Sequence, residues 1–220
     1  MARDKERTKD RIIDAVGGLL TQSGFRAVGV NAVAEAAGVD KVLIYRYFGG
    51  LAGLLEAVAE VPDLWPTVDE VLAEAGIDAG RSGEGGALAE VVAPLLVAYM
   101  RLLGRRPAAL EAVAWGVAER NPLSDALARR RSAWGNEVAG QVFRGRKAPA
   151  ERDIQAVLCV LLAAADHLMA LARQGVSFNG IQLRSNDGLR RIEDAVAVLV
   201  LGALGGVTSG ANPGVRPGPG

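Results

Sequence analysis

Residues 30–48 read VNAVAEAAGVDKVLIYRYF, and this stretch decides the fold. Apolar residues recur at helical spacing on both sides of Gly38, as Val33, Ala34 and Ala37 before it and Ile44, Tyr47 and Phe48 after it. Glycine takes a positive φ at little cost, and the Asp40 carboxylate can cap the amide groups that follow. Two short helices joined by such a turn form a helix-turn-helix, although the spacing alone fits an ordinary helical hairpin almost equally well.

Helical periodicity extends over almost the whole chain, and no strand-like alternation is visible. We therefore expect an all-α protein with helices at about 5–23, 30–37, 41–47, 51–60, 66–75, 87–103, 108–119, 123–144, 150–174 and 187–204. Pro62 and Pro66 interrupt the chain, and residues 76–86 (GIDAGRSGEGG) read as a glycine-rich loop. Residues 205–220 are rich in glycine and proline and are expected to form a disordered tail.

Composition restricts the class of protein. The 25 basic and 25 acidic side chains cancel, so no overall charge attracts the chain to nucleic acid or to a membrane. The longest apolar runs fall short of the roughly 18 to 20 residues that a membrane span requires, and the basic start of the chain lacks an apolar signal segment. A single cysteine, Cys159, excludes an intramolecular disulfide and is expected to be buried. These features predict a cytoplasmic protein outside the membrane.

Catalytic chemistry finds little support in the sequence. The chain has one histidine and one cysteine, and neither a metal-ligand spacing nor a nucleophilic triad is visible. Residues 80–86 (GRSGEGG) follow no strand and are too irregular to cradle a phosphate. We therefore expect no enzymatic activity, no metal and no cofactor.

Residues 7–55 closely resemble the DNA-binding domain of the TetR-type (tetracycline-repressor-like) transcriptional regulators. The matched features are a basic opening helix with Ile12, Ile13 and Ala15, then Gly24-Phe25, Val33-Ala34, Ala37-Gly38-Val39, Ile44-Tyr45-Arg46-Tyr47-Phe48 and Leu54-Leu55. The resemblance implies a three-helix DNA-binding domain with residues 41–47 as recognition helix, followed by a variable helical domain that dimerises and often holds a small ligand. We accordingly expect a DNA-binding domain at 1–50, a regulatory and dimerisation domain at 51–204, and the tail at 205–220.

Side-chain chemistry assigns roles along the recognition helix. With Ile44 and Phe48 pointing inward, Lys41 can donate to guanine O6 and N7. Val42 and Leu43 offer apolar contact to a thymine methyl group. Arg46 and the two tyrosines suit phosphate oxygens, although core packing is an equally good reading of Tyr47. The expected DNA-contacting residues are Gly29, Asn31, Lys41, Val42, Leu43, Tyr45, Arg46 and Tyr47.

Three features depart from the family pattern. Gly29 stands where relatives commonly place Ser or Thr as a helix cap. Residues 49–52 (GGLA) replace a small residue followed by Ser-Lys-Glu, so the expected phosphate-contacting lysine is missing. Residues 1–50 carry eight basic and six acidic side chains, a net charge of +2, which predicts modest nonspecific affinity for DNA. The alternative is therefore a helical protein-interaction or structural protein that retains a degenerate DNA-binding domain.

The last two expected helices are apolar over most of their circumference. Such a helix needs packing partners on two sides, and the second side can meet a symmetry mate in a four-helix interface. A fully buried helix in a monomer is the alternative. A homodimer suits a double-stranded DNA operator with two half-sites. The expected interface residues are Leu161, Leu168, Ile192, Val196 and Leu199.

Half of the aromatic residues lie between positions 65 and 143. With one methionine they could line a cavity for an apolar or aromatic small-molecule effector, and two polar residues of an apolar helix could anchor it. The alternative is that the aromatics are ordinary core and His167 a helix histidine with satisfied partners. Arg129, Arg130 and Arg131 are expected on a solvated face. The ligand-binding candidates are Trp65, Tyr99, Met100, Trp115, Trp134, Phe143, Asp166 and His167. The sequence thus predicts a homodimeric regulator, interpreted as a repressor that a small molecule releases from its operator.

Overall fold

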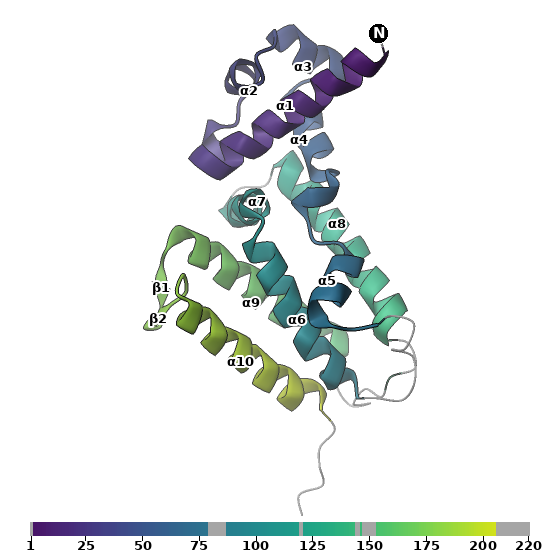
Figure 1. Cartoon of the computed structure of the whole chain (residues 1–220), viewed down its shortest axis with the longest axis vertical. Helices are drawn as coiled ribbons and strands as arrows, with labels where there is room; N and C mark the ends of the chain where they lie inside the picture. Colours follow the sequence, from purple (N-terminus) through teal and green to yellow (C-terminus); the bar gives the residue numbers. More distant parts are fainter. Residues whose placement is uncertain (1, 79–86, 119–120, 144–145, 147–152, 206–220) are drawn as a thin grey trace, which may run out of the picture.

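The computed structural model describes residues 2–78, 87–118, 121–143, 146 and 153–205, and it confirms the all-α fold (Figure 1). The expected loop at 76–86 lies outside the described residues from position 79, and so does the tail from position 206. The α-helices of the described residues are α1 (Ala2–Ser23), α2 (Val30–Ala37), α3 (Lys41–Phe48), α4 (Leu51–Ala59), α5 (Val68–Ala75), α6 (Leu88–Gly104), α7 (Pro107–Ala118), α8 (Pro122–Val138), α9 (Ile154–Gln174) and α10 (Asn186–Leu204).

Short elements complete the fold. Two 3-10 turns, η1 (Phe25–Ala27) and η2 (Pro62–Leu64), join longer helices, and a π-helical turn, η3 (Ala139–Phe143), extends α8. The expectation that the chain contains no strand is wrong between α9 and α10. There β1 (Ser177–Phe178) pairs antiparallel with β2 (Ile181–Gln182). Asn179 and Gly180 between them both have positive φ, at 48° and 77°, as a tight hairpin turn requires.

The first three helices form a small unit with its own core. Ile12 and Val16 of α1, Val33 of α2 and Ile44 of α3 are all 0% exposed. Gly38 ends α2 with φ 61° and ψ 42°, and the Val39 N–H donates to the carbonyl of Ala34 at 2.9 Å. The turn that the sequence predicted is therefore present, and it sets the angle between α2 and α3.

α4 connects this unit to a bundle of the remaining helices (Figure 1). Gly49 and Gly50, with φ values of 76° and 120°, bend the chain by 65° between α3 and α4. At this bend the first turn of α4 lies so close to the end of α3 that a Cβ atom on Gly53 would overlap the Phe48 carbonyl. In the bundle, α6 is buried along most of its length and packs against α5, α9 and α10.

α9 is long and apolar enough to cross a membrane, with a mean hydropathy of 2.0 over 18 of its 21 residues. Among the described residues, α3 and α4 together are also long and apolar enough, but only if the bent pair is counted as one span. Counting uninterrupted apolar runs missed α9, because Asp166 and His167 interrupt it. Core helices pass this test too, and α9 packs against α6, α7 and α10. Only 22% of the 18-residue stretch is buried, so one face of α9 is uncovered in the single chain.

Replacing Gly53 with alanine tests the close approach of α3 and α4. The new methyl group would meet the Phe48 carbonyl, which is backbone and cannot rotate away. We expect Gly53→Ala to lower the free energy of unfolding by about 1–3 kcal/mol, as overpacking does. The control is Gly17→Ala in α1, where nothing lies within 4 Å of the added Cβ. There helix propensity alone should raise stability by about 0.5–1 kcal/mol.

Urea denaturation followed by circular dichroism measures both variants. Equal stability of Gly53→Ala and wild type would contradict the packing of α4 on α3.

Candidate nucleic-acid interface

The outward face of α3 consists of four exposed side chains. Lys41, Val42, Tyr45 and Arg46 are all exposed, with Val42 61% and Tyr45 57% accessible. Ile44 of the same helix is fully buried, while Leu43 and Tyr47 are half-buried and pack against the core. The division of α3 into an inner and an outer face therefore agrees with the helical spacing.

The amino end of α3 is fixed by its cap. The Asp40 carboxylate accepts a hydrogen bond from the Val42 N–H at 2.8 Å. The preceding helix, α2, is capped by Gly29, which has no side chain to contribute. The Gly29 carbonyl accepts a hydrogen bond from the Val33 N–H at 2.9 Å. Asn31, in the first turn of α2, is exposed. Both helices thus present their first turns in an ordered conformation.

Tyr47 combines the two roles that the sequence left open. Its ring packs edge-on against Phe48, with 6.5 Å between centroids. Its hydroxyl oxygen accepts a hydrogen bond from Arg46 at 2.9 Å, and the Arg46 guanidinium lies 4.9 Å from the ring centroid. The Lys5 ammonium of α1 approaches the same ring at 5.8 Å. Lys5 therefore joins the α3 surface, although only the basic character of the first helix indicated this in the sequence.

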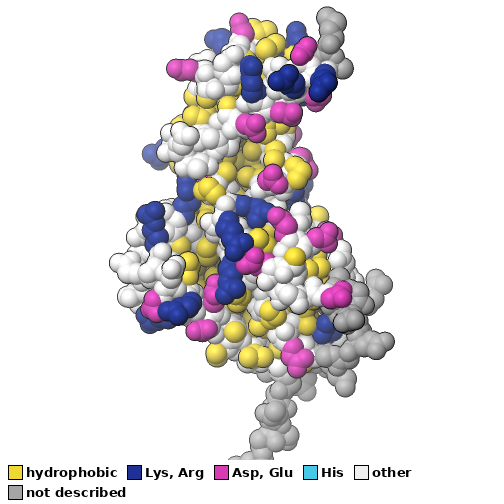
Figure 2. Space-filling model, in the orientation of Figure 1, with side chains coloured by type: hydrophobic (Ala, Val, Ile, Leu, Met, Phe, Trp, Pro, Cys, Tyr) yellow, Lys and Arg dark blue, Asp and Glu magenta, His cyan; other side chains and the backbone are white. Residues whose placement is uncertain are grey.

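The charges around this surface are mixed. Figure 2 shows basic and acidic side chains interspersed over the N-terminal unit. This distribution agrees with the net charge of +2 over residues 1–50. Contact with a polyanion would consequently depend on a few positioned cations, Lys41 and Arg46 above all, rather than on a broad positive field.

Arg130 and Trp115 contribute to the attachment of the N-terminal unit to the bundle. Arg130 of α8 donates to the carbonyl groups of Ala59 and Val61 at the end of α4, at 2.7 and 2.8 Å. Arg130 is thus a structural residue, and the expectation that Arg129, Arg130 and Arg131 share a solvated face is wrong. On the other side, Trp115 of α7 packs against Phe25 at 5.8 Å and lies 5.2 Å from the Arg26 guanidinium. Trp115 therefore lies at the junction of the two units, away from the other candidate ligand residues.

Three of the remaining aromatic candidates, Trp65, Tyr99 and Trp134, form a chain of rings. Trp65 is 6.0 Å from Tyr99, and Tyr99 is 5.4 Å from Trp134. Tyr99, Trp134 and Phe143 line an apolar cavity of about 60 Å³. The indole N–H groups of Trp65 and Trp134 are buried and find no hydrogen-bond partner among the described residues. Met100 lines a different cleft, between α6, α9 and α10.

Asp166 and His167 occupy different environments, although they are adjacent. Asp166 is 3% exposed and accepts a hydrogen bond from the Tyr99 hydroxyl at 2.6 Å. Its other oxygen forms an ion pair with Arg131 at 2.7 Å, without hydrogen-bond geometry. Burial raises the pKa of the Asp166 carboxyl, and Arg131 and Tyr99 partly offset the rise. His167 is exposed and lies edge-on to Phe178 at 6.3 Å. Both residues nevertheless line one pocket of about 250 Å³ beside Arg131, which is separate from the aromatic cavity.

The five expected interface residues differ in their exposure to solvent. Leu161 and Val196 are 8% and 7% exposed and belong to the core of the protomer itself. Leu168 and Ile192 are half-buried, and Leu199 is 59% exposed. The apolar residues that face outward on α9 and α10 are instead Val160, Val198, Leu199 and Leu201. Cys159 lies beside Val160 and is exposed, so the expectation that it is buried is wrong.

The N-terminal unit of the chain is similar in sequence to known proteins. The sequence model of the family described as "Bacterial regulatory proteins, tetR family" matches residues 12–58. An HTH-type transcriptional regulator from Mycobacterium tuberculosis strain H37Rv is 41% identical over 56 residues, which make up 26% of this chain and 28% of that protein. A regulator from strain CDC 1551 of the same organism matches equally well. The chain thus matches about a quarter of the length of these curated relatives.

Similarity of fold extends over most of the chain. A TetR-family transcriptional regulator from Rhodococcus sp. is 24% identical with a TM-score of 0.59, over 89% of this chain and 99% of that one. The transcriptional regulator FadR from Bacillus subtilis, solved in complex with stearoyl-CoA, is 15% identical with a TM-score of 0.59, over 88% and 97%. Residues 12–58 therefore belong to the N-terminal domain of the TetR family of bacterial regulatory proteins, and the chain as a whole has the fold of TetR-family regulators.

Proposed function

We propose that the chain is a sequence-specific DNA-binding transcriptional regulator that acts as a homodimer on a palindromic operator. The observation that carries this proposal is the outward face of α3, where Lys41, Val42, Tyr45 and Arg46 are exposed while Ile44 anchors the helix. A recognition helix needs this division, with its amino end nearest the bases. Lys41 stands at the first residue of α3 and can donate to a guanine edge, and Val42 beside it can contact a thymine methyl group.

Arg46 has a different role in the proposal. It lies one turn further along α3, where its hydrogen bond to the Tyr47 hydroxyl and its contact with the Tyr47 ring hold the guanidinium in place. A cation held in this way suits a phosphate oxygen, which positions the protein on any sequence. Lys41 would therefore contribute specificity, and Arg46 general affinity.

The homodimer is supported by the uncovered apolar surface of α9 and α10. Val160 is 68% exposed, Val198 69% and Leu201 52%. Several apolar side chains at such exposure on two helices are a feature of surfaces that meet another protein. Two copies paired through this surface would place two recognition helices to read half-sites about 34–36 Å apart, as one turn of DNA requires.

We also propose that the protein binds a small apolar or aromatic effector. The cavity beside Trp134 measures only about 60 Å³, whereas ligand pockets usually measure about 300–1,000 Å³, so this cavity must enlarge to admit an effector. Trp134 lines this cavity, and its buried indole N–H offers a donor to such a ligand. The FadR complex with stearoyl-CoA shows that a protein of similar fold holds a small molecule. These observations support the interpretation of the chain as a repressor that releases DNA on binding a ligand.

The route from the cavity to the DNA-binding unit runs through α8. Trp134 lines the cavity, and Arg130, one turn earlier on the same helix, holds the end of α4. A ligand that displaces Trp134 would move Arg130 and, through α4, change the distance between paired recognition helices. By linkage, the ligand then weakens DNA affinity by the same factor by which DNA weakens ligand affinity.

The DNA-binding proposal predicts different effects for two substitutions in α3. Lys41→Ala should cost about 1–3 kcal/mol on the specific site and relax one base position, because it removes a base-edge donor. Arg46→Ala should weaken binding to all sequences about equally. The control is Arg129→Ala, which removes an exposed arginine of α8 far from α3.

The operator is first obtained by selection from random DNA, and the affinities are measured by fluorescence anisotropy at one fixed salt concentration. Wild-type affinity in both α3 variants would show that α3 is not the recognition helix.

The interface proposal predicts that a charge on the exposed face separates the protomers. We expect the wild type to form a dimer at micromolar concentration without DNA, and Val198→Glu or Val160→Glu to yield a monomer of 22.9 kDa. Both side chains are exposed, so the protomer should remain folded. The matched control is Val42→Glu, because Val42 is 61% exposed on α3, outside the proposed interface.

Size-exclusion chromatography with light scattering distinguishes the two states. A wild-type mass of 22.9 kDa would exclude a constitutive dimer.

The effector proposal predicts that Arg130 transmits the response. We expect an apolar or aromatic compound that raises the melting temperature to weaken operator binding in the wild type. Arg130→Ala should keep compound binding but lose most of this effect, whereas Arg129→Ala, one residue away, should respond as the wild type does. Thermal melting and anisotropy titration measure the two steps separately. If no compound stabilised the protein, or if Arg130→Ala responded like the wild type, this route would be excluded.

A further inference from the structure

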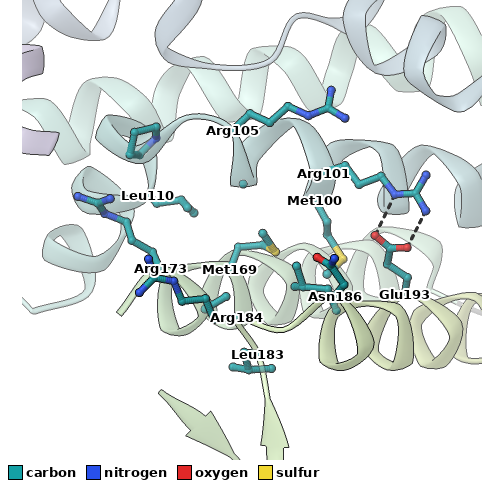
Figure 3. A pocket seen from close by; sticks show the side chains of 14 residues that line it. Met100, Arg101, Arg105, Leu110, Met169, Arg173, Leu183, Arg184, Asn186 and Glu193 are labelled. Atoms are coloured by element: carbon teal, nitrogen blue, oxygen red, sulfur yellow. Dashed lines mark hydrogen bonds and ion pairs between the residues drawn. The ribbon is translucent and has the colours of Figure 1, made fainter. Parts of the chain in front are cut away.

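A cleft of about 550 Å³ lies where α6 and α7 meet α9 and the start of α10 (Figure 3). It is separate from the aromatic cavity, and its volume falls within the range of small-molecule sites. Of its lining residues, Met100 alone is among the candidate ligand residues.

The floor of the cleft is apolar. Met100, Leu110, Met169 and Leu183 line it, and all four are at most 6% exposed. Gly104 also lines the cleft, and a Cβ atom at that position would approach the Met169 methyl carbon to 2.8 Å. The missing side chain at Gly104 therefore keeps the floor open beside Met169.

The rim of the cleft is basic, with four arginines and one carboxylate. At one end, Arg101 donates twice to Glu193, at 2.9 and 2.6 Å, and Figure 3 shows this pair opposite Arg173 and Arg184. Arg105 forms a similar double contact with Glu74, at 2.9 and 3.1 Å. These two guanidinium groups are thus already matched by carboxylates.

The other two arginines are less fully matched. Arg173 lies 3.6 Å from the nearest Glu111 oxygen, beyond hydrogen-bond range. Arg184 is exposed and has neither an ion pair nor a hydrogen bond among the described residues. Asn186, beside them, begins α10, and the positive end of a helix dipole also favours an anion.

We propose that this cleft binds a small organic acid, with its carboxylate at Arg173 and Arg184 and its apolar body on the methionine and leucine floor. A guanidinium group pairs with a carboxylate in a fork geometry. A single negative charge fits better than a double one, because Glu111 already compensates part of the Arg173 charge. An inorganic anion would leave the apolar floor in contact with water, and a neutral compound would leave the Arg184 cation without a partner.

A ligand in the cleft would also affect operator binding, an effect that rests on the proposed function as a DNA-binding regulator. Arg173 donates to the Thr21 carbonyl in the last turn of α1 at 2.8 Å. Its neighbour Glu111 accepts from the Phe25 N–H at 3.3 Å. A carboxylate that draws Arg173 into the cleft would compete with these contacts, which join the bundle to the N-terminal unit. The organic acid therefore weakens operator binding.

The binding step is tested on the full chain without DNA, by isothermal titration calorimetry. The probes are 4-phenylbutyrate, the neutral 4-phenyl-1-butanol with the same ring and chain, and acetate with the same charge. We expect 4-phenylbutyrate to bind once per protomer, and the other two probes at least about tenfold more weakly.

Arg184→Ala should weaken 4-phenylbutyrate binding about tenfold, while Arg129→Ala, which removes an exposed arginine elsewhere, should bind as the wild type does. Arg184 supports no contact that the fold requires, so the variant should melt at the wild-type temperature. Failure of 4-phenylbutyrate to bind, equal binding of the alcohol, or wild-type affinity in Arg184→Ala would each overturn the proposed site.

Operator affinity is measured separately, first without any probe, so that a failure of DNA binding is distinguished from a failure of the cleft. Saturating 4-phenylbutyrate should then weaken operator binding at least about fivefold in the wild type. At the same concentration it should have a much smaller effect on Arg184→Ala. Unchanged operator affinity in a protein that binds the probe would overturn the regulatory step.

Discussion

The placement of the N-terminal unit depends on the guanidinium of Arg130. Where α4 ends at Ala59, the last carbonyl groups of the helix have no partner within the helix itself. Arg130 reaches from α8 to the Ala59 and Val61 carbonyls, and it lies 3.4 Å from that of Pro62. The planar fork of one side chain thus satisfies several acceptors at the point where the chain passes from one unit to the other. Without it, α4 would lose its most specific attachment to the bundle.

Sequence patterns correctly predicted the structural features that are set by residues close together in the chain. The helices, the turn at Gly38 and the outward face of α3 all follow from spacing and capping over a few positions. The hairpin before α10 was equally local, because Asn179-Gly180 between short apolar stretches is a strong turn signal, but its strands are only two residues long. A search for longer alternation passes over such strands.

Features that depend on distant residues could not be predicted in the same way. Arg130 meets carbonyl groups about 70 positions earlier, and Arg131 meets Asp166, while the run Arg129 to Arg131 looks like a solvated stretch. When a helix is apolar on all sides, its spacing also does not indicate which side packs against the core of the same protomer. Leu161 and Val196 were therefore assigned to an interface, although they are buried within the protomer, whereas Val160 and Val198 are exposed.

The tight turn at Asn179-Gly180 has a consequence for how two protomers would meet. It brings the end of α9 and the start of α10 together, with β1 in contact with α9 and β2 in contact with α10, while α10 itself packs mainly on α6. Contacts between segments close in sequence form quickly, because little loop entropy is lost in closing them. The junction between these two helices therefore forms within each chain. Association would then be the docking of two finished surfaces, governed by mass action, rather than folding coupled to binding.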